Sequence, residues 1–390
     1  MNTLRKQRNI PLMYAICFFQ GIVLYASIST LYRQARGLSL AEYAVIDGFS
    51  YLFQLAFEIP LGMLADRMGY KKTLVLSNGI YLLSKIVFWQ AFSFGSFLLE
   101  RLFFAMALAG LSGLDTSILY LSCGKQDSQK VFSWYSAFGT AGMLTGCVIF
   151  TLFLSTNYDA TAFGTVIAYG IAFVLSFFVA DVKDAEDKDP RPSISRLVEI
   201  LKLTLKDRKF LLFILGDAMI CYGAWASRVF LCQQKLISVG LTEQHIGWME
   251  IVISCLGLSA VASAALTKKL GFKGFMVSCV LTISSGALVL GLTGDPGLAI
   301  LCSILIDLAC CWMNPLTSEL YNRRVTVSDR ATQLSVYAML TELLSFGISF
   351  LMAAVSAWST LGSFVLCSAM ALAGVFLFLY CYRGVNTLNK

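Results

Sequence analysis

Charged residues, prolines and histidines are all scarce in this chain of 390 residues. Only 14% of its residues are charged and 57% are apolar, whereas a soluble domain has about 25% charged and about 45–50% apolar residues. A water-soluble core cannot bury so much hydrophobic surface, which excludes a soluble enzyme. The single histidine, His245, cannot build a His-based metal site by itself, and 6 prolines are too few for a collagen-like chain.

Sequence patterns for catalysis, metal binding and nucleotide binding are also missing. None of the 12 cysteines forms a Cys-x-x-Cys pair, and nearly all lie in apolar stretches, which predicts buried, reduced thiols. No G-x-x-x-x-G-K-[ST] loop occurs, so we expect no direct use of ATP. We therefore expect no enzymatic activity, no metal and no cofactor. A sensor that does not transport remains an alternative.

Long apolar runs dominate the chain. A helix needs about 20 apolar residues to cross a bilayer, and twelve such runs predict an all-α polytopic membrane protein, which we expect to be a monomer. We expect two six-helix bundles, at 1–180 and 209–390, joined by a cytoplasmic linker at 181–208. Part of this linker has helical spacing and predicts a helix along the membrane surface. The runs are 11–33, 40–64, 73–94, 97–121, 131–154, 160–180, 209–232, 243–266, 275–293, 297–321, 331–355 and 359–382.

Lysine and arginine predict the orientation of these spans. The net charge is +7, and most of the basic residues fall in alternate links, which would share one side of the membrane. Because basic loops stay on the inner side, both termini are expected in the cytoplasm, with the protein in the cytoplasmic membrane. The positive charge then reflects topology, so we expect no nucleic-acid partner.

The two halves of the chain resemble each other. Gly37-Leu38-Ser39 recurs as Gly240-Leu241-Thr242, about 200 residues later, and residues 64–71 match residues 266–273 at six positions. An internal duplication explains both matches, and many secondary transporters are built from such repeats.

One loop resembles the signature of a known family. The sequence GMLADRMGYKK at 62–72 resembles the signature G-x-L-a-D-r-x-G-r-k-k of the major facilitator superfamily. The resemblance implies the twelve-helix fold of that family and transport of a small organic solute by alternating access. It also implies a conformational switch, in which Asp66 would face the start of a later span near Ala331 and Thr332. The motif residues are Gly62, Asp66, Arg67, Gly69, Lys71 and Lys72.

Two further motifs bear on the direction of transport. Glu58-Ile59-Pro60 and Arg330-Ala331-Thr332 resemble a bacterial branch that carries E-I-P-x-G and R-A-T-x-L-S. This resemblance favours efflux driven by a proton gradient. Two departures from proton-coupled exporters weaken that assignment: Arg101 is followed by Ala105 rather than by glycine, and the glycine-rich run at 131–154 has no proline. Uptake, proton-coupled or facilitated, and flipping of an amphipathic or lipid-like substrate remain alternatives.

Ionisable residues within spans are functional candidates because they are costly to insert. In the superfamily, spans 1, 4, 7 and 10 line the central cavity. Helical spacing places Asp217 and Arg228 on one face of 209–232, and Arg101 and Asp115 on one face of 97–121. A carboxylate in a cavity of low dielectric can load and release a proton. The candidates for proton coupling are Asp217, Asp115, Glu342 and Asp307.

The candidates for substrate binding are Arg228, Arg101, Gln20, Tyr222, Trp225 and Asn314. An alternative remains in which each charge is paired within its own bundle, for example Arg228 with Glu250. Aromatic residues near span ends are expected to anchor the protein at the membrane interface; they are Trp134, Tyr135, Tyr321, Trp358 and Tyr382.

Overall fold

The chain folds into helices throughout the part that its computed structural model describes, which is 8–123, 128–182, 194–325 and 330–386. Within these ranges, nine helical stretches are long and apolar enough to cross a membrane. The predicted class, an all-α membrane protein, is confirmed. The count of twelve spans stays a prediction, because the helices α4 (Leu40–Met68), α5 (Tyr70–Gln90) and α13 (Glu243–Gly257) fall outside this set.

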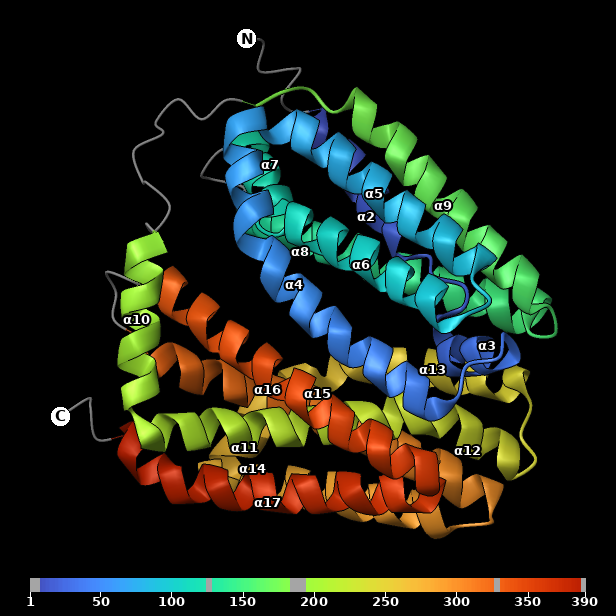
Figure 1. Cartoon of the computed structure of the whole chain (residues 1–390), viewed down its shortest axis with the longest axis vertical. Helices are drawn as coiled ribbons and strands as arrows, with labels where there is room; N and C mark the ends of the chain where they lie inside the picture. Colours follow the sequence, from blue (N-terminus) through green and yellow to red (C-terminus); the bar gives the residue numbers. More distant parts are fainter. Residues whose placement is uncertain (1–7, 124–127, 183–193, 326–329, 387–390) are drawn as a thin grey trace. The chain divides into compact units, whose positions relative to one another are not determined.

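The first compact unit comprises Met1–Leu38, Phe49–Lys188 and Glu243–Ile251. In this unit α2 packs against α8 and α9, and α5 packs against α6 and α9 (Figure 1). A 3₁₀ turn, η1 (Ala26–Ile28), precedes α3, and a π-helical segment, η2 (Phe150–Leu154), extends α8. Besides α5 and the part of α4 from Phe49 on, the helices are α2 (Asn9–Gly21), α3 (Ser29–Ala35), α6 (Phe94–Leu111), α7 (Leu114–Cys123), α8 (Ser128–Ile149) and α9 (Tyr158–Phe178).

The second unit comprises Ser39–Gly48, Asp189–Thr242 and Val252–Lys390. Here α11 packs against α16 and α17, and α14 packs against α15 and α17 (Figure 1). A π-helical segment, η3 (Ala226–Leu231), joins α11 to α12, and a 3₁₀ segment, η4 (Leu258–Ala262), joins α13 to α14. The helices are α10 (Ile194–Lys206), α11 (Arg208–Trp225), α12 (Cys232–Ser238), α14 (Ser263–Leu292), α15 (Pro296–Arg324), α16 (Arg330–Trp358) and α17 (Thr360–Asn386).

The pairs of packed helices repeat between the units. Helix α2 packs on α8 and α9 as α11 packs on α16 and α17. Helix α5 packs on α6 and α9 as α14 packs on α15 and α17. The predicted bundle boundaries, 1–180 and 209–390, differ from the two units in the assignment of Ser39–Gly48 and Glu243–Ile251. Those boundaries stay a prediction.

Matching glycines give the duplicated loops the same backbone conformation. Gly37 has φ 93° and Gly240 has φ 91°, and each ends a helix in the region that favours glycine. The following amides donate alike: Leu38 to the Arg33 carbonyl at 3.0 Å and Leu241 to the Leu236 carbonyl at 3.1 Å. In the second matched loop, Gly69 and Gly271 also have positive φ, 83° and 70°. The conformations support the predicted duplication.

Glycines also bring helices close together inside each unit. A Cβ added to Gly142 of α8 would lie 2.0 Å from the Phe18 carbonyl oxygen of α2. A Cβ on Gly216 of α11 would lie 2.7 Å from the carbonyl oxygen of Gly374 in α17, and one on Gly374 would lie 2.5 Å from that of Gly216. The glycine-rich run at 131–154 thus lets α8 approach α2 closely, as small-residue faces allow.

The predicted linker helix is present as α10. It packs against α11 and α16. Ile200 and Thr204 are buried, while Lys202, Leu203 and Lys206 are exposed. Its placement along the membrane surface stays a prediction.

Candidate substrate-binding site

A cavity of about 330 Å³ lies within the second unit, between α15 and the stretch formed by α11 and η3. Ligand cavities for small molecules begin at about this size. Four residues that the sequence singles out as candidates meet here, from two different helical stretches. The lining residues are Cys221, Ala224, Trp225, Arg228, Asp307, Cys310, Cys311, Met313 and Asn314.

An ion pair is the main polar feature of this cavity. The Arg228 Nε lies 2.8 Å from the Asp307 Oδ1, and the two side chains are 30% and 18% exposed. The guanidinium has five N–H donors in a fixed fork, so the single contact with Asp307 leaves donors for another acceptor. The alternative that Arg228 is paired within its own bundle is met by Asp307, and a pairing with Glu250 stays a prediction.

The helix that carries Arg228 widens at that point. After Trp225, α11 passes into the π-helical segment η3, a feature that often marks functional sites. Asp217 and Arg228 nevertheless both contact α15, one through Tyr321 and the other through Asp307. The prediction that they share a face is confirmed.

Asp217 lies beside the cavity and is held by hydrogen bonds. The Tyr321 hydroxyl donates to the Asp217 Oδ2 at 2.8 Å, and the Cys221 thiol donates to the Oδ1 at 3.7 Å. Asp217 itself is buried, whereas Cys221 also lines the cavity. The role of Tyr321 as an interfacial anchor is a wrong prediction, because its ring packs on Phe213 and its hydroxyl binds Asp217.

In the first unit, the continuous helix on which the predicted shared face of Arg101 and Asp115 was based is interrupted, and the shared face stays a prediction. Helix α6 ends at Leu111, the backbone turns at Gly113 with φ 72°, and α7 begins at Leu114. Glycine permits this turn at little cost, which interrupts the helix between the two charges. The Tyr135 hydroxyl donates to Asp115 at 2.7 Å, so Tyr135 too has an inward partner rather than the predicted interfacial role alone.

Arg101 belongs to a buried charge cluster that the sequence did not reveal. The Glu100 Oε2 lies 3.6 Å from the Arg101 Nε and 3.7 Å from the Arg33 Nη2. Both Arg33 and Glu100 have side chains only 2% exposed. The alternative that Arg101 pairs with a carboxylate of its own bundle is therefore confirmed. Their positions near predicted span ends gave no signal of this pairing.

Lys85 lies in the same unit, among aromatic rings. Its Nζ donates to the Tyr25 hydroxyl at 3.0 Å and lies about 5 Å from the ring centres of Tyr81, Phe104 and Tyr169. Such cation–π contacts stabilise a buried ammonium. Gln20 donates to the Asn78 side chain at 2.7 Å, and its predicted contact with substrate stays a prediction.

The remaining candidates lie apart from the cavity lining. Tyr222 is 3% exposed and packs on the Trp225 ring at 5.7 Å, while Glu342 is partly buried on α16. The predicted switch between Asp66 and residues 331–332 falls on side chains outside those described, so it stays a prediction. Of the motif, Arg67 and Lys72 are exposed.

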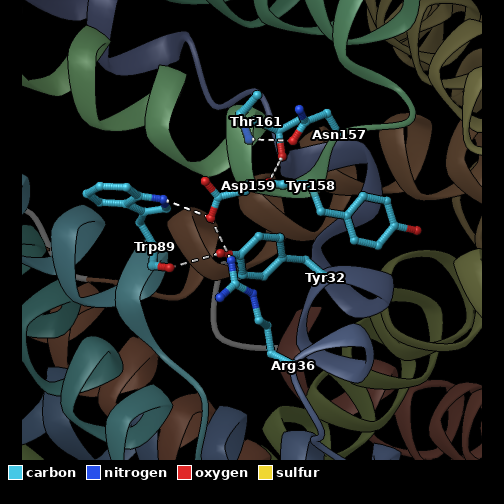
Figure 2. Close-up of polar contacts among 8 residues, drawn as sticks. Tyr32, Arg36, Trp89, Asn157, Tyr158, Asp159 and Thr161 are labelled. Carbon is cyan, nitrogen blue, oxygen red and sulfur yellow. Dashed lines mark hydrogen bonds and ion pairs between the residues drawn. The ribbon is translucent and has the colours of Figure 1, made fainter.

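A polar cluster joins three helices at one end of the first unit (Figure 2). The Asp159 Oδ1 accepts from the Arg36 Nη2 at 2.8 Å and from the Trp89 Nε1 at 3.0 Å. The Tyr32 hydroxyl donates to the Trp89 carbonyl at 3.2 Å, and the Asn157 side chain caps α9. Because each group has a local partner and Asp159 is 65% exposed, this cluster holds α3, α5 and α9 together.

The fold is shared with transporters of known structure. The nucleoside transporter NupG superposes with a TM-score of 0.80 at 16% identity, covering 96% of this chain and 99% of that chain. A POT family transporter in complex with 5-aminolevulinic acid gives 0.72 at 12% identity, covering 97% of each chain. A D-xylose-proton symporter gives 0.68 at 14% identity, covering 98% of each. At such low identity these likenesses show the fold.

The family itself is shown by sequence. Among curated proteins none matches this chain. The family model described as Major Facilitator Superfamily, however, matches residues 12–234, which is more than half of the chain. The loop motif, the all-helical fold and this match agree, and the chain belongs to the major facilitator superfamily of membrane transporters.

Proposed function

We propose that this chain is a secondary active transporter that exports a small organic solute in exchange for protons. The observation that carries the proposal is the Arg228–Asp307 ion pair in the cavity of the second unit. The resemblance of Glu58-Ile59-Pro60 and of Arg330-Ala331-Thr332 to a bacterial branch supports export. The distribution of basic residues supports the cytoplasmic membrane, with both termini inside.

Asp307 supplies a chemical basis for the exchange. A carboxylate in this half-buried site can bind a proton, the Arg228 side chain or a positive group of the substrate. When the proton binds, the negative charge that held the other two is lost. Proton and substrate then bind in turn rather than together, which is the requirement for exchange. Asp217, Asp115 and Glu342 stay candidates for a second proton site.

The same ion pair supports proton-coupled uptake as a second candidate. If the substrate is an anion held by Arg228 alone, protonation of Asp307 frees the guanidinium. Proton and anion then bind together, as co-transport requires. One of the similar structures is a D-xylose-proton symporter.

The sign of an imposed pH gradient separates the two functions. The purified chain in proteoliposomes is screened with a library of small solutes, and accumulation in the lumen is measured. An acidic lumen drives accumulation if the protein exchanges solute for protons, whereas an acidic exterior drives it if the two move together. Asp307→Asn is expected to abolish gradient-driven accumulation, and Asp159→Asn, at the exposed cluster, serves as the control. Wild-type accumulation by the Asp307→Asn variant contradicts the proposal.

A further inference from the structure

The Arg228–Asp307 contact leaves room for two substrate groups of opposite charge. The pair uses the guanidinium Nε and one carboxylate oxygen. The terminal guanidinium nitrogens are geometrically suited to a carboxylate, which they bind through two parallel hydrogen bonds. Asp307 has its second oxygen for a positive group. Both side chains line the cavity, together with the amide of Asn314.

Charge balance decides which substrate can separate the pair. An anion that takes Arg228 leaves the charged Asp307 without a partner and next to a second negative charge. A cation that takes Asp307 leaves Arg228 in the same position. Unpaired charges are strongly unfavourable at low dielectric. A substrate that carries both charges replaces both partners and adds no net charge to the site.

The rest of the cavity suits an apolar body. The Trp225 ring lines the cavity and packs against two other rings, Phe230, with ring centres 6.3 Å apart, and Tyr222. Ala224 and Met313 add apolar surface, and Cys310 and Cys311 add thiols. We infer that the solute is a small zwitterion with an apolar body, whose negative group binds Arg228 and whose positive group binds Asp307. The inference rests on the proposed function, since it names the substrate class of that site.

The thiols of the cavity provide a direct test. The probes are three matched sets, each with a zwitterion, an amine and an acid of similar size. The first set is alanine, ethylamine and propionate, and the second is leucine, isopentylamine and 4-methylpentanoate. The third is phenylalanine, phenethylamine and 3-phenylpropionate. The purified full chain is treated with N-ethylmaleimide, and mass spectrometry follows the peptide that carries Cys310 and Cys311. Both thiols are partly exposed in the cavity lining.

In at least one set we expect the zwitterion to protect these thiols at about tenfold lower concentration than the amine or the acid. The inference is overturned if a singly charged probe protects as well as the zwitterion in every set, or if no zwitterion protects. Cys255, an exposed cysteine outside the lining, reports non-specific effects on the reagent.

Two variants assign the charges. In Arg228→Gln the zwitterion should protect the thiols no better than the amine does. In Asp307→Asn it should protect them no better than the acid does. Asp159→Asn should leave both ratios of protecting concentrations unchanged. An unchanged ratio in both cavity variants overturns the inference. The proposed function fails separately: protection by a zwitterion without any pH-gradient-driven transport contradicts exchange but leaves the substrate class standing.

Discussion

Each unit holds an arginine–carboxylate pair in its interior, but the surroundings of the two pairs differ. In the first unit Glu100 is shared by Arg33 and Arg101, and its side chain is 2% exposed. In the second unit Arg228 and Asp307 are 30% and 18% exposed and line a cavity. A small solute cannot reach the enclosed pair, whereas it can reach a pair that lines a cavity and replace one charged partner there. If the Arg228–Asp307 pair binds substrate as proposed, the two halves use similar charges for different purposes.

The largest expected effect tests the enclosed pair. Glu100→Gln leaves two arginines without their shared carboxylate, and breaking a buried pair in this way costs about 3–5 kcal/mol of stability. Thermal unfolding of the purified protein in detergent measures this loss. Asp307→Asn is the matched variant in the second unit and should destabilise the protein less, because the Arg228 side chain is 30% exposed. Equal losses would remove the contrast between the two pairs.

A second prediction concerns the close helix contact in the first unit. Gly142→Ala places a methyl group against the Phe18 carbonyl, where a Cβ would lie 2.0 Å from the oxygen, and overpacking of this kind costs about 1–3 kcal/mol. Gly170→Ala, on α9, is the control because a Cβ there meets nothing within 4 Å. Unfolding temperatures of the two variants provide the comparison, and a Gly142→Ala protein as stable as the control contradicts the packing.

A third prediction tests what the units share. Tyr135→Phe and Tyr321→Phe each remove one hydroxyl that donates to a buried or partly buried aspartate, at 2.7 Å and 2.8 Å. Each loss should cost about 1 kcal/mol, with similar shifts in unfolding temperature for the two variants. A large difference between them would show that the two aspartate–tyrosine pairs are not equivalent.

The smallest expected effect lies at the cluster of Figure 2. Arg36→Gln breaks the ion pair with Asp159, whose side chain is 65% exposed, so the change in stability should stay within about 1 kcal/mol. The same unfolding assay, run at low and high salt, measures it. A loss as large as that of Glu100→Gln would show that exposure does not set the contribution of these pairs.

The sequence was informative where local pattern decides structure. Helical spacing placed Asp217 and Arg228 on one face, and the matching glycines of the two halves have matching positive φ. Trp225, Arg228, Asp307 and Asn314 were candidates from their residue types, and the structure brings them to one cavity. Their roles in transport stay predictions.

Partners across helices could not be derived in this way. The pairing of Arg228 with Asp307 depends on which helices pack together, and that is a tertiary property. The break at Gly113 was missed because a single glycine in an apolar run is compatible with a continuous helix. Tyr321 and Tyr135 were placed at the interface from their position near span ends, while their hydroxyls bind aspartates.

The contact between α11 and α17 has a consequence for biosynthesis. These helices touch through the reciprocal approach of Gly216 and Gly374, yet α17 is translated long after α11. At about 5–20 residues per second, the ribosome needs on the order of 10–30 s to make the intervening chain. During that interval the glycine face of α11 lacks this partner. The packing of the second unit can therefore be completed only after α17 has been made.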